Sequence, residues 1–143
     1  EEHGKVLEEQ AVKHRIGFVA PYLQLYDEFN ALENLQLLSR MRSTDVRGLR
    51  EMQRLLEQFS LWHRRTDAVR TYSSGMKQRL KYVFALLHKP DVLILDEPGS
   101  NLDAEGLEGV ENVVSRQREG GLLVIATNDA HEAGWCSERI HLG

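Results

Sequence analysis

Long apolar runs are scarce in this sequence. The longest lie at residues 92–95 and 122–126, and neither approaches the roughly 20 residues that a helix needs to cross a bilayer. Residues 1–4 are acidic and polar, so we expect no secretory signal there. With 143 residues, 41% apolar and 28% charged, the chain has the composition and length of a globular protein with a real core.

Cysteine is nearly absent as well. Cys136 is the single cysteine, so no internal disulfide can form, which fits a reducing compartment such as the cytoplasm. The six histidines show no metal-binding spacing, and His131-Glu132 lacks the second histidine of a zinc-binding helix. We therefore expect neither a disulfide framework nor a zinc centre.

Charge is unevenly distributed although the net value is only −4. Residues 40–89 carry twelve Lys or Arg against four Asp or Glu, or +8, and the remainder carries six against eighteen, or −12. A basic segment of this kind can meet anions such as nucleic acid, or it can be an ordinary solvated helical surface. We favour the solvated surface and expect no nucleic-acid partner.

Hydrophobic periodicity and turn signals predict alternating strands and helices. Strands are expected near residues 5–7 and at 16–20, 92–95, 122–126 and 139–142. Helices are expected from residue 31, over 46–59, from the Ser73-Ser74 cap to Lys89-Pro90, around 107–114 and over 130–135. Continuous apolar strands at 92–95 and 122–126 are typical of strands buried on both faces of a parallel sheet. The pattern predicts an α/β fold, with the three earlier helices forming a separate basic lobe.

The strongest chemical signal is the apolar run at 92–95 that ends in Asp96-Glu97-Pro98. A strand of this kind delivers Asp96 to its carboxyl end, where α/β sheets bind ligands. In P-loop NTPases such an Asp holds Mg²⁺ through water, and a following Glu can act as general base toward the attacking water. An acidic turn after an ordinary strand is the alternative.

A second signal lies about twenty residues upstream, at Tyr72-Ser73-Ser74-Gly75-Met76. Small residues that lead into a helix leave backbone N–H groups free to bind phosphate, and glycine allows a close approach. In isolation this segment would be interpreted as an ordinary serine-capped helix.

Taken together, these segments resemble the ABC ATPase family. Residues 72–76 are similar to its Leu-Ser-Gly-Gly-Gln signature motif, and residues 92–98 are similar to its Walker B motif. Residues 100–103, Ser-Asn-Leu-Asp, resemble the D-loop; residues 16–35 resemble the Q-loop region; and residues 127–129 fall where the switch histidine belongs. The resemblance runs in the family's order over nearly the whole chain.

The resemblance implies a P-loop NTPase-like parallel sheet core, incomplete at its N-terminus, with a helical subdomain. It divides the chain into residues 1–28 (sheet region and Q-loop), 29–90 (helical signature subdomain) and 91–143 (Walker B, D-loop and switch loop). In the family, two ATPase domains pack head to tail, with each ATP held between one Walker A loop and the partner's signature motif. The residues implied in site roles are Ser73, Ser74, Gly75 and Met76 toward the partner's nucleotide, Ser100 and Asp103 in the D-loop, Asp96 for Mg²⁺, and Glu97 and Asn128 in catalysis.

Several departures from the family pattern bear on activity. The 143 residues contain no Gly-x-x-x-x-Gly-Lys-Ser/Thr, the loop that cradles the β- and γ-phosphates. In the family that loop precedes the Q-loop, so a truncation before Glu1 is the simplest interpretation. Pro21 stands at the Q-loop glutamine position and Asn128 at the switch histidine. Ser74 and Met76 stand where the signature motif usually has glycine and glutamine, and we expect both variants to be tolerated.

We therefore expect an ATP-hydrolysing subunit of an ABC transporter that uses ATP and Mg²⁺. It would act in the cytoplasm at the inner face of the membrane, bound to a transmembrane subunit, and this chain alone would be a poor ATPase. Two alternatives stay open: a degenerate, non-catalytic module that dimerises or docks, and a soluble ABC protein that acts on ribosomes or DNA.

Overall fold

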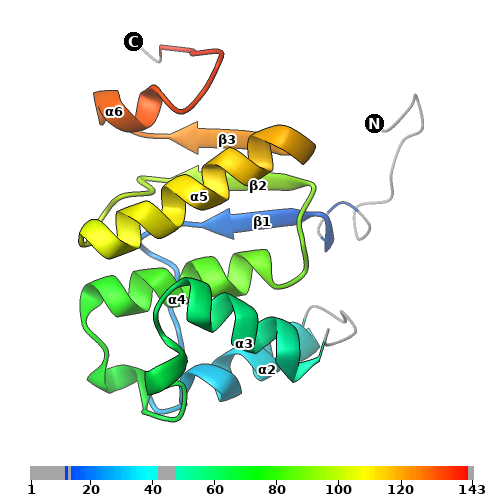
Figure 1. The fold of residues 1–143 in the computed structure, drawn as a ribbon, viewed down its shortest axis with the longest axis vertical. Helices are drawn as coiled ribbons and strands as arrows, with labels where there is room; N and C mark the ends of the chain where they lie inside the picture. The colour runs from blue at the N-terminus through cyan, green and yellow to red at the C-terminus, as the bar shows by residue number, and fades with distance from the viewer. Residues whose placement is uncertain (1–11, 13, 42–47, 142–143) are drawn as a thin grey trace.

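The fold is built on three parallel strands and five α-helices in a computed structural model that describes residues 12, 14–41 and 48–141 (Figure 1). The strands are β1 (Ile16–Val19), β2 (Val92–Asp96) and β3 (Leu122–Ala126). The α-helices are α2 (Ala31–Met41), α3 (Leu49–Gln58), α4 (Ser74–Leu86), α5 (Ala104–Gly120) and α6 (Ala130–Ala133). Two 3₁₀ turns, Trp62–Arg64 and Val69–Thr71, join α3 to α4.

The sheet has the order β1-β2-β3, and both strand pairs are parallel. Val19 pairs with Leu95, and Asp96 at the end of β2 pairs with Ala126 at the end of β3. All three strands therefore end at the same edge, where the loops that follow them lie close together (Figure 1). The predicted parallel α/β architecture is confirmed.

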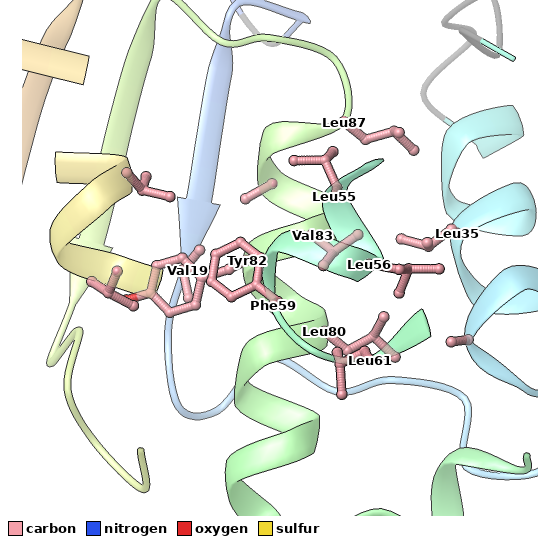
Figure 2. Close-up of a cluster of buried hydrophobic side chains, with 14 of the residues drawn as sticks. Val19, Leu35, Leu55, Leu56, Phe59, Leu61, Leu80, Tyr82, Val83 and Leu87 are labelled. Carbon is pink, nitrogen blue, oxygen red and sulfur yellow. The ribbon is translucent and has the colours of Figure 1, made fainter. Parts of the chain in front are cut away.

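Helices pack against one face of this sheet. Helix α5 crosses the strands, and α4 packs beside β1 with α2 and α3 beyond it (Figure 1). Val19, Leu93 and Leu95 on that face are fully buried and belong to a core that also contains helical residues such as Leu56 and Val110. Figure 2 shows the centre of this core, where the Tyr82 ring of α4 lies beside Phe59 at the end of α3.

The expectation that residues 122–126 form a strand buried on both faces is wrong. β3 lies at the edge of the described sheet, with β2 as its neighbour there. Leu122 is 58% and Val124 44% exposed. Residues 92–95 are also buried on one face only, because Leu93 and Leu95 alternate with the partly exposed Val92 and Ile94. A run of apolar residues indicates that a strand is at least partly buried, but it does not indicate whether one or both faces of the sheet are covered by other elements.

Two further strand predictions have different outcomes. Residues 139–141 form no strand, so the predicted final strand is wrong over that part, and Leu142 lies outside the described residues. The strand expected near residues 5–7 also lies outside them. The helix predicted over 46–59 is described from Leu49 onward.

Among residues 12, 14–41 and 48–141, none of the helices combines the length and the apolarity that a bilayer span requires.

Candidate functional site

The candidate site is built at the carboxyl ends of β2 and β3. Asp96 is the last residue of β2 and is partly exposed. The next residue continues the ladder, because the Glu97 amide donates to the Ala126 carbonyl at 2.8 Å. Glu97 has a left-handed φ of 47°, which is uncommon for a residue other than glycine and is often found at functional turns. The turn directs the chain away from the sheet immediately after the two carboxylates.

Glu97 and Asn128, the two residues assigned to catalysis by resemblance, lie side by side. The Asn128 side-chain amide donates to Glu97 Oε1 at 3.2 Å. Asn128 is exposed and Glu97 is half-buried, so both can reach a bound molecule. The structure thus brings together a carboxylate that can accept a proton and a neutral hydrogen-bond donor.

The donor set available to a metal is small. Within the described part of the chain, no cluster of three or more His, Cys, Asp or Glu side chains is placed to hold a metal ion. Asp96 at the strand end fits Mg²⁺ all the same, because Mg²⁺ keeps several of its waters and is often held by one or two carboxylates together with substrate phosphates.

Residues 72–76 form the entry to α4. Ser73 is the N-cap, and its Oγ accepts a hydrogen bond from the Met76 amide at 3.1 Å. Ser73 and Ser74 are exposed, and Gly75 and Met76 are half-buried. The predicted serine cap is confirmed at Ser73, while Ser74 is the first residue of the helix. The exposed helix N-terminus can meet an anion supplied from outside this chain.

The same segment lies against the loop that follows β2. A β-carbon added to Gly75 would lie 2.9 Å from the Asn101 carbonyl oxygen, which is closer than a real side chain tolerates. Asn101 itself has a left-handed φ of 62°. Gly75 is therefore required for residues 72–76 and 100–103 to sit in contact.

Asp103 and Arg79 extend this contact into the helices. Asp103 is the N-cap of α5 and accepts from the Gly106 amide at 2.9 Å. Its other carboxylate oxygen lies 3.8 Å from Nη2 of the buried Arg79, whose Nη1 donates to the Phe59 carbonyl at 3.2 Å and lies 3.3 Å from Glu105. Sequence reasoning missed Arg79, because an arginine on an amphipathic helix is usually solvated.

The loop between β1 and α2, where the resemblance puts Pro21 in place of glutamine, is fastened to α4. Lys81 donates to the Pro21 carbonyl at 2.6 Å, and Lys77 pairs with Asp27 at 2.7 Å. Burial lowers the pKa of Lys81, and the neighbouring Lys77 lowers it further. Gln24 is exposed. At the position where the family pattern has glutamine, this chain therefore contacts α4 through the backbone carbonyl of Pro21.

Tyr82 contacts the loop that carries Glu97 through a buried hydrogen bond. Its hydroxyl, fully buried, donates to the Pro98 carbonyl at 2.8 Å, and its ring stacks on Phe59 at 5.6 Å between centroids. Burial raises the pKa of Tyr82 above its ordinary value, and the negative charge of Glu132 raises it further. Tyr82 therefore stays neutral and donates throughout the physiological range.

We expect Tyr82→Phe to lower the free energy of unfolding by about 1–3 kcal/mol at pH 7, because the buried Pro98 carbonyl loses its donor. The difference in unfolding free energy between wild type and Tyr82→Phe should shrink above about pH 10. Tyrosine ionises there in the unfolded chain, whereas Tyr82 in the folded protein keeps its proton. The wild-type protein therefore loses stability as the pH rises, and the phenylalanine variant does not. Denaturant titrations at both pH values measure this, with the exposed Tyr22→Phe as control. An unchanged midpoint at pH 7 would contradict the role.

Known proteins resemble this chain in sequence. The ABC transporter family matches residues 2–100. The daunorubicin resistance ATP-binding protein DrrA3 of Streptomyces coeruleorubidus is 36% identical over 140 residues, which cover 96% of this chain and 44% of that protein. The chain thus spans less than half the length of this curated relative.

Solved structures resemble it in fold. CbiO1 from Clostridium perfringens, part of the ABC transporter complex cbiONQ, has a TM-score of 0.64 and 27% identity over 82% of this chain and 48% of its own. The ATP-binding cassette MJ0796, in a dimeric post-hydrolysis state bound to ADP and Pi, has a TM-score of 0.75 and covers 90% of this chain and 60% of its own. At 21% identity the second likeness bears on the fold alone, which agrees with the predicted sheet core.

Proposed function

The chain belongs to the ABC transporter family, and from that premise we propose that it forms part of the ATP-binding and ATP-hydrolysing subunit of a transporter. The observation that carries the proposal is the pairing of Glu97 with Asn128 at the common edge of β2 and β3. Two loops far apart in sequence bring together a carboxylate and a hydrogen-bond donor, and Asp96 directly precedes that carboxylate, which supports a site for hydrolysis of a bound phosphate.

Each residue at this edge has a separate role. Asp96 would hold Mg²⁺, and the ion would supply positive charge to offset that of the phosphates. Glu97 orients the attacking water and accepts its proton. Asn128 steadies Glu97 through the 3.2 Å hydrogen bond and presents its remaining amide proton to the γ-phosphate.

Residues 72–76 serve a second copy rather than the same ATP. Ser73, Ser74, Gly75 and Met76 would face the nucleotide of a partner ATPase domain in a head-to-tail dimer. Support comes from the exposure of both serines at the start of a 13-residue helix. Ser100 and Asp103 would lie at the same interface.

The partner in the membrane would contact the loop between β1 and α2. This loop exposes three aromatic side chains, Tyr22, Tyr26 and Phe29, at 68%, 46% and 40%. Exposed aromatic residues are enriched at protein interfaces. The relative cbiO1 is part of a transporter complex, and by analogy we place this chain at the cytoplasmic face of the membrane. The division into residues 1–28, 29–90 and 91–143 is proposed on the same basis.

A non-catalytic docking module is the second candidate. The observations that favour it are Pro21 and Asn128 at positions where the family pattern has glutamine and histidine. A protein that acts on nucleic acid is less well supported, because cations of the basic segment pair with carboxylates outside it: Lys77 with Asp27, and Arg79 with Glu105.

Calorimetric titration with Mg-ATP tests the proposal. We expect the 143-residue chain to bind weakly or not at all, because it contains no Gly-x-x-x-x-Gly-Lys-Ser/Thr loop to hold the β- and γ-phosphates. The matched sample is this chain joined to the preceding part of a related ABC subunit that carries the loop, and its control replaces the loop lysine by alanine.

Saturable binding should appear in the joined protein and disappear in its lysine variant. Low-micromolar affinity in the 143 residues alone would reveal an unforeseen site. Failure of the joined, folded protein to bind would count against ATP binding by this chain.

A further inference from the structure

Glu132 is a buried carboxylate that the site described above does not use. It lies on α6 and is 7% exposed. Its Oε1 accepts a hydrogen bond from the Gly99 amide at 2.7 Å, and its Oε2 accepts one from the Thr127 hydroxyl. Both partners are donors, so each oxygen of the carboxylate serves as a hydrogen-bond acceptor. A charged group in such a position needs these bonds to offset its burial.

The two partners belong to the two loops of the site. Gly99 follows Glu97 by two residues in the loop after β2, and Thr127 directly precedes Asn128 in the loop after β3. One carboxylate therefore bridges the segment that carries the proposed base and the segment that carries its donor.

The contact between Gly99 and Glu132 requires a residue without a side chain at position 99. A β-carbon at that position would lie 2.4 Å from Glu132 Oε1, which no side chain could occupy without displacing the carboxylate. The approach of Glu132 to the loop after β2 thus depends on glycine.

Thr127 is fixed from its other side. Its Oγ accepts from the Asp129 amide at 2.9 Å, and Asp129 Oδ1 in turn accepts from the amides of His131 and Glu132 at 2.7 and 3.1 Å. The spacing of Asp129 and Glu132 is that of a capping box, in which the glutamate would bond back to the N-cap amide. Here the Asp129 amide bonds to Thr127 instead, and the glutamate carboxylate bonds to Gly99 and Thr127.

We propose that Glu132 is a positioning residue that sets the separation of Glu97 and Asn128. Their hydrogen bond of 3.2 Å is at the long end of the normal range, so a small shift of either loop breaks it. The Glu132 carboxylate bonds to Gly99 and Thr127, and it acts on Glu97 and Asn128 through these neighbours. The structural part of this inference stands on those contacts alone, and its catalytic consequence rests on the proposed function.

The test uses three variants in the full chain. Glu132→Ala removes both bonds. Glu132→Gln can keep an acceptor for Gly99 but sets an NH₂ group against the Thr127 hydroxyl, and Thr127→Val removes that same contact from the other side. Glu111→Gln is the control, because Glu111 also faces α6, 3.8 Å from His131, yet belongs to neither loop.

Nuclear magnetic resonance gives the direct readout. In Glu132→Ala the Gly99 amide should exchange about tenfold or more faster, as expected when a charge-assisted hydrogen bond is lost. In all three variants the Asn128 side-chain amide and the Glu97 carboxyl signals should shift, and Glu132→Gln and Thr127→Val should be non-additive when combined. If the variants are less stable but these signals are unchanged, the inference is overturned. If Glu132→Ala fails to fold, the two milder variants, Glu132→Gln and Thr127→Val, decide the question.

A kinetic arm separates this inference from the proposed function. In an ATP-hydrolysing subunit that contains this chain, Glu132→Gln should lower kcat about tenfold with KM unchanged, because a misplacement of less than 1 Å acts on the reacting geometry and not on ATP affinity. A wild-type subunit without hydrolysis would refute the proposed function and leave the resonance result standing. Hydrolysis that is indifferent to Glu132→Gln would refute the positioning role.

Discussion

Glu97→Gln is expected to lower ATP turnover by about 10²–10⁴-fold, the usual effect of losing a general base, while nucleotide-driven dimers persist. The glutamine oxygen can still accept the hydrogen bond that Asn128 donates to Glu97 Oε1. The left-handed backbone at φ 47° and the amide bond to Ala126 are also kept. Only the capacity to accept a proton is removed, so the variant isolates the chemical step from the architecture.

Steady-state hydrolysis and dimerisation by light scattering, both in a subunit that contains this chain, measure the two halves of this expectation. Glu119→Gln is the matched control, since Glu119 is exposed near the end of α5 that leads into the start of β3, at the opposite edge of the sheet from the carboxyl ends of the strands. Turnover near the wild-type rate in Glu97→Gln would remove Glu97 from the role of base. Loss of both turnover and dimers would show that its role is architectural.

Asn128→His is expected to accelerate single-turnover hydrolysis in the same subunit by roughly ten- to a hundredfold, the equivalent of a charged hydrogen bond worth about 1.5–3 kcal/mol. A neutral amide donates more weakly than an imidazolium, and the neighbouring Glu97 carboxylate would favour the charged ring. Because histidine titrates near pH 6.5, the gain should be largest at low pH and fade as pH rises above the pKa of the new side chain. Dimer affinity should change little.

Asn128→Ala completes the comparison, because it removes the amide without adding a ring. We expect it to be slower than wild type, with Glu97 released from its partner. If the histidine variant is no faster and shows no new pH dependence, asparagine is no handicap at this position. Another group would then have to contact the γ-phosphate.

Local features of the site could be predicted from the sequence. An apolar run that stops at two carboxylates placed Asp96 and Glu97 at a strand end, and a serine before an amphipathic run placed the cap at Ser73. Both predictions depend on residues adjacent in the chain, where backbone geometry alone determines the outcome.

The contacts between segments could not be predicted in the same way. Glu132 reaches Gly99 across 33 positions of sequence, while its spacing to Asp129 is that of a capping box, which has a different bonding pattern. Exposure of Leu122 and Val124 was missed because an apolar strand sequence does not report which faces are covered. Such features arise from the assembled packing and have no local signal.

The buried ring pair of Tyr82 and Phe59 bears on how the protein unfolds. The pair joins α4 and the end of α3 in one cluster with Val19 of the sheet (Figure 2). Leu95 of the sheet belongs to the same cluster. Because the helices and the sheet share this hydrophobic cluster, neither part has a complete hydrophobic core when the other is removed. Melting should therefore occur in a single cooperative transition, and residues 29–90 excised by themselves would expose the faces of Phe59 and Tyr82 to water rather than form an autonomous folding unit.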